Sequence, residues 1–102
     1  MVVNEDGEIV CMNGECLRNL RVNVGNPLGK NLMDILEPSI DNQRFVNMVT
    51  KGRSIADEKI TLTANGERFQ CNITCNNMGQ PGFTVVNIRE SRRVNHMIRN
   101  WT

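Results

Sequence analysis

The sequence predicts an α+β domain: a five-stranded antiparallel sheet with short helices on one face and a C-terminal amphipathic helix. Three observations support this fold class. Short apolar runs flank Asp6-Gly7, apolar residues recur at helical spacing within residues 30–51, and apolar and polar residues alternate with period two from Ile55 onward. Two strands, short helices, three strands and a final helix therefore follow one another along the chain.

Length and composition allow one small domain. The 102 residues are 39% hydrophobic and 23% charged, and 12 Lys plus Arg against 11 Asp plus Glu leave a net charge of +1. This balance excludes nucleic-acid or membrane-surface binding driven by bulk charge. No apolar run approaches the roughly 20 residues of a membrane helix, and no signal peptide is visible. We expect a cytoplasmic domain that contacts neither nucleic acid nor membrane.

The first half of the chain alternates short elements with turns. Residues 2–12 read as two strands around Asp6-Gly7, because this dipeptide favours the positive φ of a hairpin turn. Residues 15–20 predict a short helix, and the glycines and proline of residues 21–29 predict a loop.

Two helices are expected next. Residues 30–36 form a short helical turn that stops before a proline. Residues 41–51 are the best internal helix, with Ser39 or Asp41 as its cap and Gly52 as its stop.

The second half predicts three strands and a terminal helix. Alternating residues at 60–63 and 69–75 flank Asn65-Gly66, a strong hairpin signal, and residues 83–88 form a further strand. Residues 89–102 form an amphipathic helix, with four apolar residues at i, i+3, i+4 and i+7. These are Val94, Met97, Ile98 and Trp101.

The order of elements resembles that of the PAS sensor domain, and four local motifs agree. Residues 6–10, DGEIV, resemble its D-G-x-I hairpin, and residues 29–36, GKNLMDIL, resemble its G-[KR]-[ND]-[LI]-x-[DE]-[IL] segment. Residues 65–67, NGE, match its central hairpin. Residues 87–90, NIRE, stand where the family ends its last strand with D-I-T-E. The resemblance spans residues 1–90 and implies a sensory and dimerisation domain.

Departures from the family bear on cofactors. Asn87 replaces the frequent Asp of D-I-T, so an acidic interaction at that corner is in doubt. The N-C-R-F-L-Q motif of flavin-binding members is absent, and the helix at 41–51 has no histidine where haem-binding members often carry their iron ligand. The comparison disfavours flavin and haem and leaves an unidentified small molecule as the open ligand.

Residues 89–102 also resemble the connector between a PAS domain and the ATPase module of sigma-54-dependent transcriptional activators. The helical pattern ends without a stop signal. We therefore expect a PAS-like sensor domain at 1–88 and the start of a signalling helix at 89–102, in a longer chain. The apolar face of this helix packs either on its own sheet or on the same helix of a second subunit.

A ligand pocket is expected between the 41–51 helix and the sheet, because this fold can enclose a mostly apolar cavity there. The alternative is that the same side chains simply fill the core. The candidates are Phe45, Val49, Ile60, Leu62, Phe69, Cys71, Ile73 and Val86.

The cysteines and the single histidine give no catalytic or metal-binding pattern. Neither the five-residue step from Cys11 to Cys16 nor the four-residue step from Cys71 to Cys75 is a CxxC motif, and no metal site is predicted. Redox sensing would need an exposed thiol of low pKa. No motif of an enzyme is present, and His96 lies on the terminal helix.

These observations predict a non-catalytic PAS-type sensory and dimerisation domain. We expect a homodimer that regulates a covalently linked effector beyond residue 102, in a transcriptional regulator. Three alternatives remain: a ligand-free structural dimerisation module, a thiol redox sensor, and the input domain of a histidine kinase.

Overall fold

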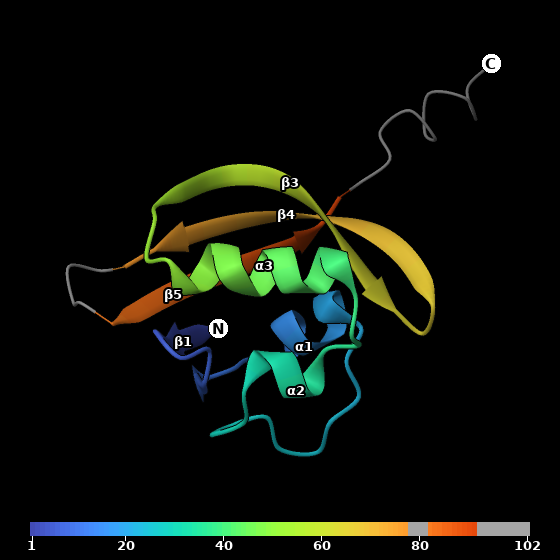
Figure 1. The fold of residues 1–102 in the computed structure, drawn as a ribbon, viewed down its shortest axis with the longest axis horizontal. Coiled ribbons are helices and arrows are strands. Elements are labelled where there is room, and N and C mark those ends of the chain that lie inside the picture. Colours follow the sequence, from blue (N-terminus) through green and yellow to red (C-terminus); the bar gives the residue numbers. More distant parts are fainter. Residues whose placement is uncertain (78–81, 92–102) are drawn as a thin grey trace.

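The computed structural model describes residues 1–77 and 82–91. Its five strands form one antiparallel sheet in the order β2-β1-β5-β4-β3 (Figure 1). The predicted α+β class is confirmed, although the expected terminal helix lies largely outside the described residues. The elements are β1 (Val2–Asn4), β2 (Ile9–Cys11), α1 (Gly14–Leu20), α2 (Leu32–Ile35), α3 (Ile40–Thr50), β3 (Ile55–Ala64), β4 (Glu67–Asn76) and β5 (Phe83–Glu90).

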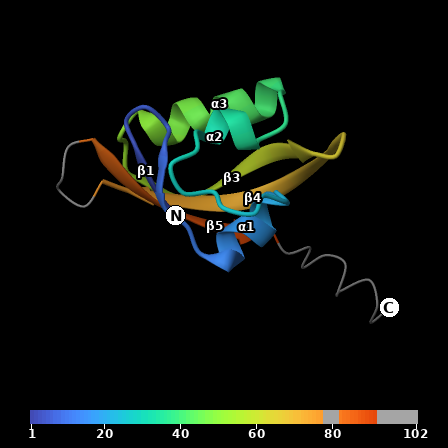
Figure 2. The same ribbon diagram turned by 90° about the horizontal axis from the view of Figure 1, so that it is seen from below.

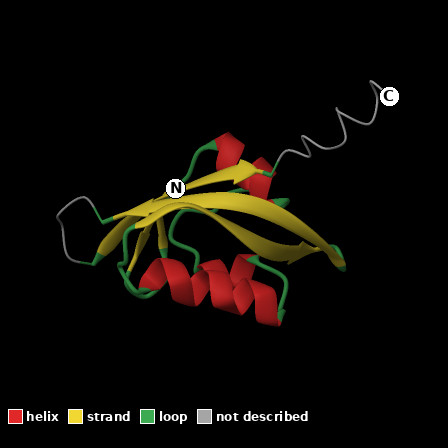
Figure 3. Ribbon diagram, turned by 90° about the horizontal axis from the view of Figure 1, so that it is seen from above, coloured by secondary structure: helices red, strands yellow, loops and turns green. Residues whose placement is uncertain are grey.

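The core lies between the helices and the inner face of the sheet. Figures 2 and 3 show α2 and α3 on the same side of the sheet, and α1 lies against β5. Alternation along β4 and β5 places one set of side chains on this inner face, as the sequence predicts. Burial of each such side chain stabilises the fold by about 1.5–3 kcal/mol. The most buried side chains of the core are Val3, Ile9, Leu20, Leu32, Phe45, Val49, Leu62, Cys71, Ile73, Cys75 and Val86.

The N-terminal hairpin is hydrogen-bonded to the loop before α2. The Ile9 amide donates to the Lys30 carbonyl at 2.9 Å, and the Leu32 amide donates to the Gly7 carbonyl at 2.9 Å. Asn31 Nδ2 donates to the Asp6 carbonyl at 2.7 Å. Gly7 has φ +85°, and a Cβ there would lie 3.2 Å from Asn31 Oδ1. The DGEIV and GKNLMDIL motifs therefore form one interlocked unit.

The outer edge of β3 is hydrogen-bonded by a side chain of α3. Asn42, 3% exposed, donates to the Thr63 carbonyl at 2.9 Å and accepts from the Thr63 amide at 2.9 Å. It also donates to the Glu37 carbonyl at 2.7 Å. A single amide side chain thus replaces a neighbouring strand, which satisfies polar groups that an open edge exposes.

The edge of β5 beyond β1 is covered in a similar way. β1 pairs with residues 83–85, and the Val86 amide donates to the Met1 carbonyl at 2.7 Å. Beyond Val86 a side chain of α1 satisfies this edge, because Asn19 Nδ2 donates to the Ile88 carbonyl at 2.7 Å. Asn19 therefore anchors α1 beside the second half of β5.

Two predicted boundaries need correction. β5 runs to Glu90 rather than Ile88, because Arg89 and Glu90 pair with Asn72 and Cys71 of β4. The two residues that we assigned to the terminal helix therefore belong to the sheet. α3 runs over Ile40–Thr50 rather than 41–51, and its cap is Ser39, one of the two residues predicted for it, whose side chain accepts from the Asn42 amide. The alternation of β5 did not show which of its two valines faces the core. In the structure Val86 is buried and Val85 is half-buried, so Val86 faces inward.

Replacing Asn42 by Ala should lower the free energy of unfolding by about 2 kcal/mol, because it leaves partly buried backbone groups of β3 without partners. Asn47→Ala is the matched control: Asn47 is on the same helix but exposed, and its replacement should change stability by less than about 0.5 kcal/mol. Urea denaturation measures both. Equal effects of the two substitutions would contradict the edge role of Asn42.

Candidate functional site

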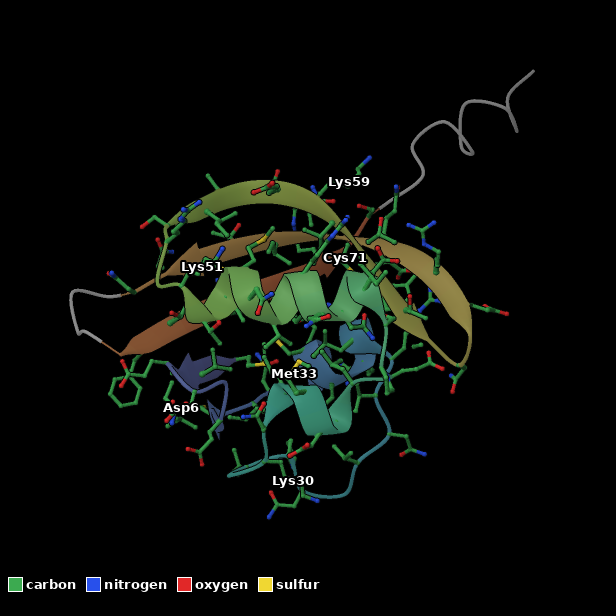
Figure 4. The ribbon with its side chains drawn as sticks, in the orientation of Figure 1. Asp6, Lys30, Met33, Lys51, Lys59 and Cys71 are labelled. Atoms are coloured by element: carbon green, nitrogen blue, oxygen red, sulfur yellow. The ribbon has the colours of Figure 1, made fainter. Side chains whose placement is uncertain are left out.

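The eight side chains predicted to line a pocket come together between α3 and the sheet. Phe45 and Val49 lie on α3, and the others lie on the three long strands. All are buried except Ile60, which is half-buried and packs against the same cluster. Figure 4 places Cys71 where β4 passes behind α3.

Most of these side chains pack without a space for solvent. Val49, Cys71, Ile73 and Val86 are 0% exposed, and Phe45 and Leu62 are 1% exposed. A void that admitted water would leave exposed area on the side chains around it. A ligand among these six would therefore have to displace them, so the internal pocket stays a prediction.

A cleft of about 400 Å³ lies between the chain after α1, α2 and the end of β3. We name it the α2–β3 cleft. Its apolar lining consists of Leu20, Val22, Val24, Ile35, Leu36 and Ala64. Its polar lining consists of Arg21, Asn23, Asp34, Glu37, Thr63 and Asn65. The lining combines apolar side chains with charged groups of both signs, and small-molecule sites use such polar groups to orient a ligand.

A second hollow of about 240 Å³ lies between α3 and β3. Phe45 and Ile60, two of the predicted pocket residues, line it together with charged side chains of both signs. Two of these charged side chains form an ion pair with each other, because Arg68 Nε lies 2.9 Å from Asp41 Oδ2. The α2–β3 cleft is larger and is the stronger candidate site.

Arg21 connects the α2–β3 cleft to the end of β5. Its guanidinium lies over the Phe69 ring, 4.1 Å from the centroid, and its Nη2 lies 3.8 Å from Glu90 Oε1. The two charged side chains are 42% and 69% exposed. Each contact is therefore worth about 1 kcal/mol or less. Arg21 holds β5 by a contact that is weak enough to be displaced.

A polar cluster on the outer face holds the same end of β5. Arg89 forms an ion pair with Asp57 of β3, Asn72 of β4 donates to Asp57 at 3.2 Å, and Ser91 donates to Asn72. We name Asp57, Asn72, Arg89 and Ser91 the outer cluster. The Arg89 guanidinium, and next the Asn72 amide, hold the pKa of the Asp57 carboxyl below its ordinary value.

Backbone strain is found at both of these contacts. Within residues 1–77 and 82–91, three non-glycine residues have positive φ: Arg21 at 56°, Asp57 at 46° and Asn65 at 56°. Asn65 lies in the β3–β4 hairpin, where this conformation is usual. Arg21 ends α1, Asp57 lies at a break in the β3 register, and their side chains contact the consecutive residues Glu90 and Arg89. Unusual backbone geometry thus positions both side chains that hold the end of β5.

The cysteines differ in exposure. Cys16, Cys71 and Cys75 are buried and Cys11 is exposed. Desolvation raises the pKa of the Cys71 thiol and of the Cys75 thiol to about 11. Buried thiols of high pKa are poor redox sensors.

The residues that matter most in this geometry were not among those predicted. Arg21, Asp57 and Arg89 occur in a loop and two strand ends, and no spacing connects them. The only sequence signal was the departure at residues 87–90, where Arg89 replaces the family's threonine. The predicted signalling-helix residues Val94, Met97, Ile98 and Trp101 lie outside the described residues.

Metal and membrane sites are not seen in the part of the chain that the structure describes. Within residues 1–77 and 82–91, no three His, Cys, Asp or Glu side chains gather to hold a metal ion. None of the helices there has both the length and the apolar character needed to cross a membrane.

A family model decides the family. The model of the PAS domain matches residues 1–91. The chain belongs to the PAS family. This confirms the resemblance at the level of the family, while the origin in a sigma-54-dependent regulator remains a proposal. A search of the curated proteins found no match for this PAS domain.

Two solved structures share the fold. The PAS domain of Bordetella pertussis BvgS has a TM-score of 0.67 at 14% identity, over 98% of this chain and 81% of that one. A chain in the crystal structure of the E. coli DhaR(N)–DhaL complex has a TM-score of 0.65 at 14% identity, over 89% of this chain. This PAS domain spans only 30% of that chain.

Alkylation should separate the cysteines. At about pH 8 a thiol with a pKa near 11 is ionised in about one molecule per thousand, so Cys71 and Cys75 should resist iodoacetamide while Cys11 reacts. Peptide mass spectrometry locates the label, and the unfolded protein, in which all four should react, is the control. Labelling of Cys71 or Cys75 as fast as Cys11 would contradict this picture.

The Asp57 carboxyl should titrate below its ordinary pKa in an NMR pH titration. Replacing Arg89 by Gln should raise this pKa toward the ordinary value, because the guanidinium is the largest cause of the shift. The Asp57–Arg89 contact therefore stabilises the fold fully above the ordinary carboxyl pKa, and this stabilisation is lost as the pH falls through the lowered pKa of the folded state. Arg68→Gln, which removes the Arg–Asp pair between β4 and α3, should leave the pKa of Asp57 unchanged. An ordinary pKa in the unmodified protein would refute the contact.

Proposed function

We propose that this PAS domain is the sensory input of a longer regulatory protein, and that its state controls an effector that follows it in the chain. PAS domains are generally sensory and signalling modules. The observation that carries the proposal is the end of β5, where weak polar contacts from α1 and from the outer cluster hold the last strand. The proposed role is regulatory and not catalytic.

The proposed setting is a cytoplasmic transcriptional regulator that works as a homodimer. The similarity of residues 89–102 to the connector of sigma-54-dependent activators supports the regulator. The apolar spacing of Val94, Met97, Ile98 and Trp101 supports a helix that pairs with a second copy. The fold likeness to a chain of the DhaR(N)–DhaL complex agrees with a PAS domain that binds a partner protein.

Other functions fit the structure to different degrees. The closely packed core agrees with a ligand-free structural dimerisation module. The burial of Cys71 and Cys75, with the pKa of each raised to about 11, counts against a thiol redox sensor. A histidine kinase could follow the same end of β5 as the effector, because the PAS fold does not determine which effector it controls.

The test compares two substitutions in the full-length protein that contains this domain. Arg89→Gln removes the pair between β5 and β3, whereas Arg68→Gln removes a pair between β4 and α3 whose arginine is similarly exposed, 70% against 67%. Arg89→Gln should change effector activity by about threefold or more, as expected for loss of about 0.7 kcal/mol of coupling, and Arg68→Gln should not. A purely structural module predicts that neither substitution changes activity while dimerisation is retained, which would refute the proposal.

A further inference from the structure

We propose that the α2–β3 cleft binds a small apolar zwitterion, such as an aliphatic α-amino acid, and that Arg21 transmits its occupancy to the end of β5. This inference deepens the proposed function, on which it rests, by naming the ligand class and the contact that responds to it. The cleft volume of about 400 Å³ falls within the range of small-molecule sites, about 300–1,000 Å³.

The apolar lining provides the surface for a short aliphatic group. Leu36 and Ala64 are buried, while Val22 and Ile35 are half-buried and present free apolar area. These residues come from three parts of the chain, so an aliphatic group there contacts apolar side chains on more than one side.

The charged groups favour a ligand that carries both signs. Arg21 follows α1, whereas Asp34 and Glu37 belong to α2 and the residues just after it. Both oxygens of Glu37 lie 3.2 Å from the Gly66 amide, and a carboxylate with two oxygens has further acceptor positions. An ammonium group pairs with Asp34 or Glu37, and a carboxylate pairs with Arg21. A simple acid or amine leaves one side of the cleft unmatched.

Arg21 is shared between the cleft and the last strand. Arg21 lines the cleft, and its guanidinium lies over the Phe69 ring and reaches Glu90 at 3.8 Å. A ligand carboxylate therefore competes with Glu90 for the same cation. Two residues earlier, Asn19 donates to the Ile88 carbonyl, so a shift at the end of α1 acts on β5 at two points. Occupancy of the cleft thus weakens the hold on Glu90.

The experiment is a methyl NMR titration of the 102-residue chain with leucine, 4-methylpentanoate and 3-methylbutylamine. The two analogues keep the aliphatic group and remove one charge each. Leucine should shift the methyls of Val22, Ile35 and Leu36 in a saturable way, and should bind about tenfold more tightly than either analogue. Ile73 and Val86, in the core, should shift little.

Two arginine substitutions test the relay. Arg21→Gln should weaken leucine binding by about tenfold while leaving the weak binding of 3-methylbutylamine unchanged, since the amine does not use the guanidinium. Arg18→Gln removes an exposed arginine of α1 that does not line the cleft, and should bind leucine normally. Arg21→Lys keeps the charge and should restore part of the affinity, which excludes a folding defect as the cause.

Several results would overturn the inference. The first is the absence of a saturable shift up to about 10 mM leucine. The second is equal affinity for the three compounds, and the third is a set of shifts confined to the core methyls. The proposed function is judged separately. If leucine does not bind but Arg89→Gln still changes effector activity, the input role stands and the cleft assignment fails.

Discussion

The structure depends on how the open edges of its sheet are hydrogen-bonded. A strand edge without a neighbour presents unpaired amides and carbonyls, and asparagine side chains from two helices meet this need. Asn42 binds both backbone groups of Thr63, and Asn19 binds the Ile88 carbonyl where β1 no longer covers β5. These two contacts determine where α3 and α1 lie. Because Asn19 holds α1 there, Arg21 lies next to Glu90.

The end of β5 is held by its pairing with β4 and by exposed polar contacts from α1 and β3. In the core, each fully buried aliphatic side chain contributes about 1.5–3 kcal/mol. The Arg21–Glu90 pair is exposed and contributes about 1 kcal/mol at most. A small difference in ligand affinity between two states is enough to shift a contact of this size. A filled core and a responsive strand end can therefore belong to the same sensory domain.

The sequence predicted what local patterns control. Alternation along residues 69–75 and the Asn65-Gly66 turn are local signals, and the structure has the hairpin they predict. The eight pocket candidates are assembled as expected, but a cavity depends on packing volumes that periodicity does not contain. Arg21 contacts Glu90 and Asp57 contacts Arg89 through sheet register, a break in β3 and two positive φ values, so no short motif indicates these pairs. The polar residues Arg89 and Glu90 suggested a linker, whereas pairing with β4 makes them strand.

Hydrogen exchange at the Ser91 amide tests most directly whether the cleft controls the end of β5. This amide donates to the Gln70 carbonyl at 3.2 Å, at the last described residue of the chain. Saturating leucine should speed its exchange by about threefold or more, because Glu90 loses Arg21, while the Ile73 amide in the middle of β4 should not respond. If leucine occupies the cleft and the Ser91 amide exchanges at an unchanged rate, Arg21 does not connect the two sites.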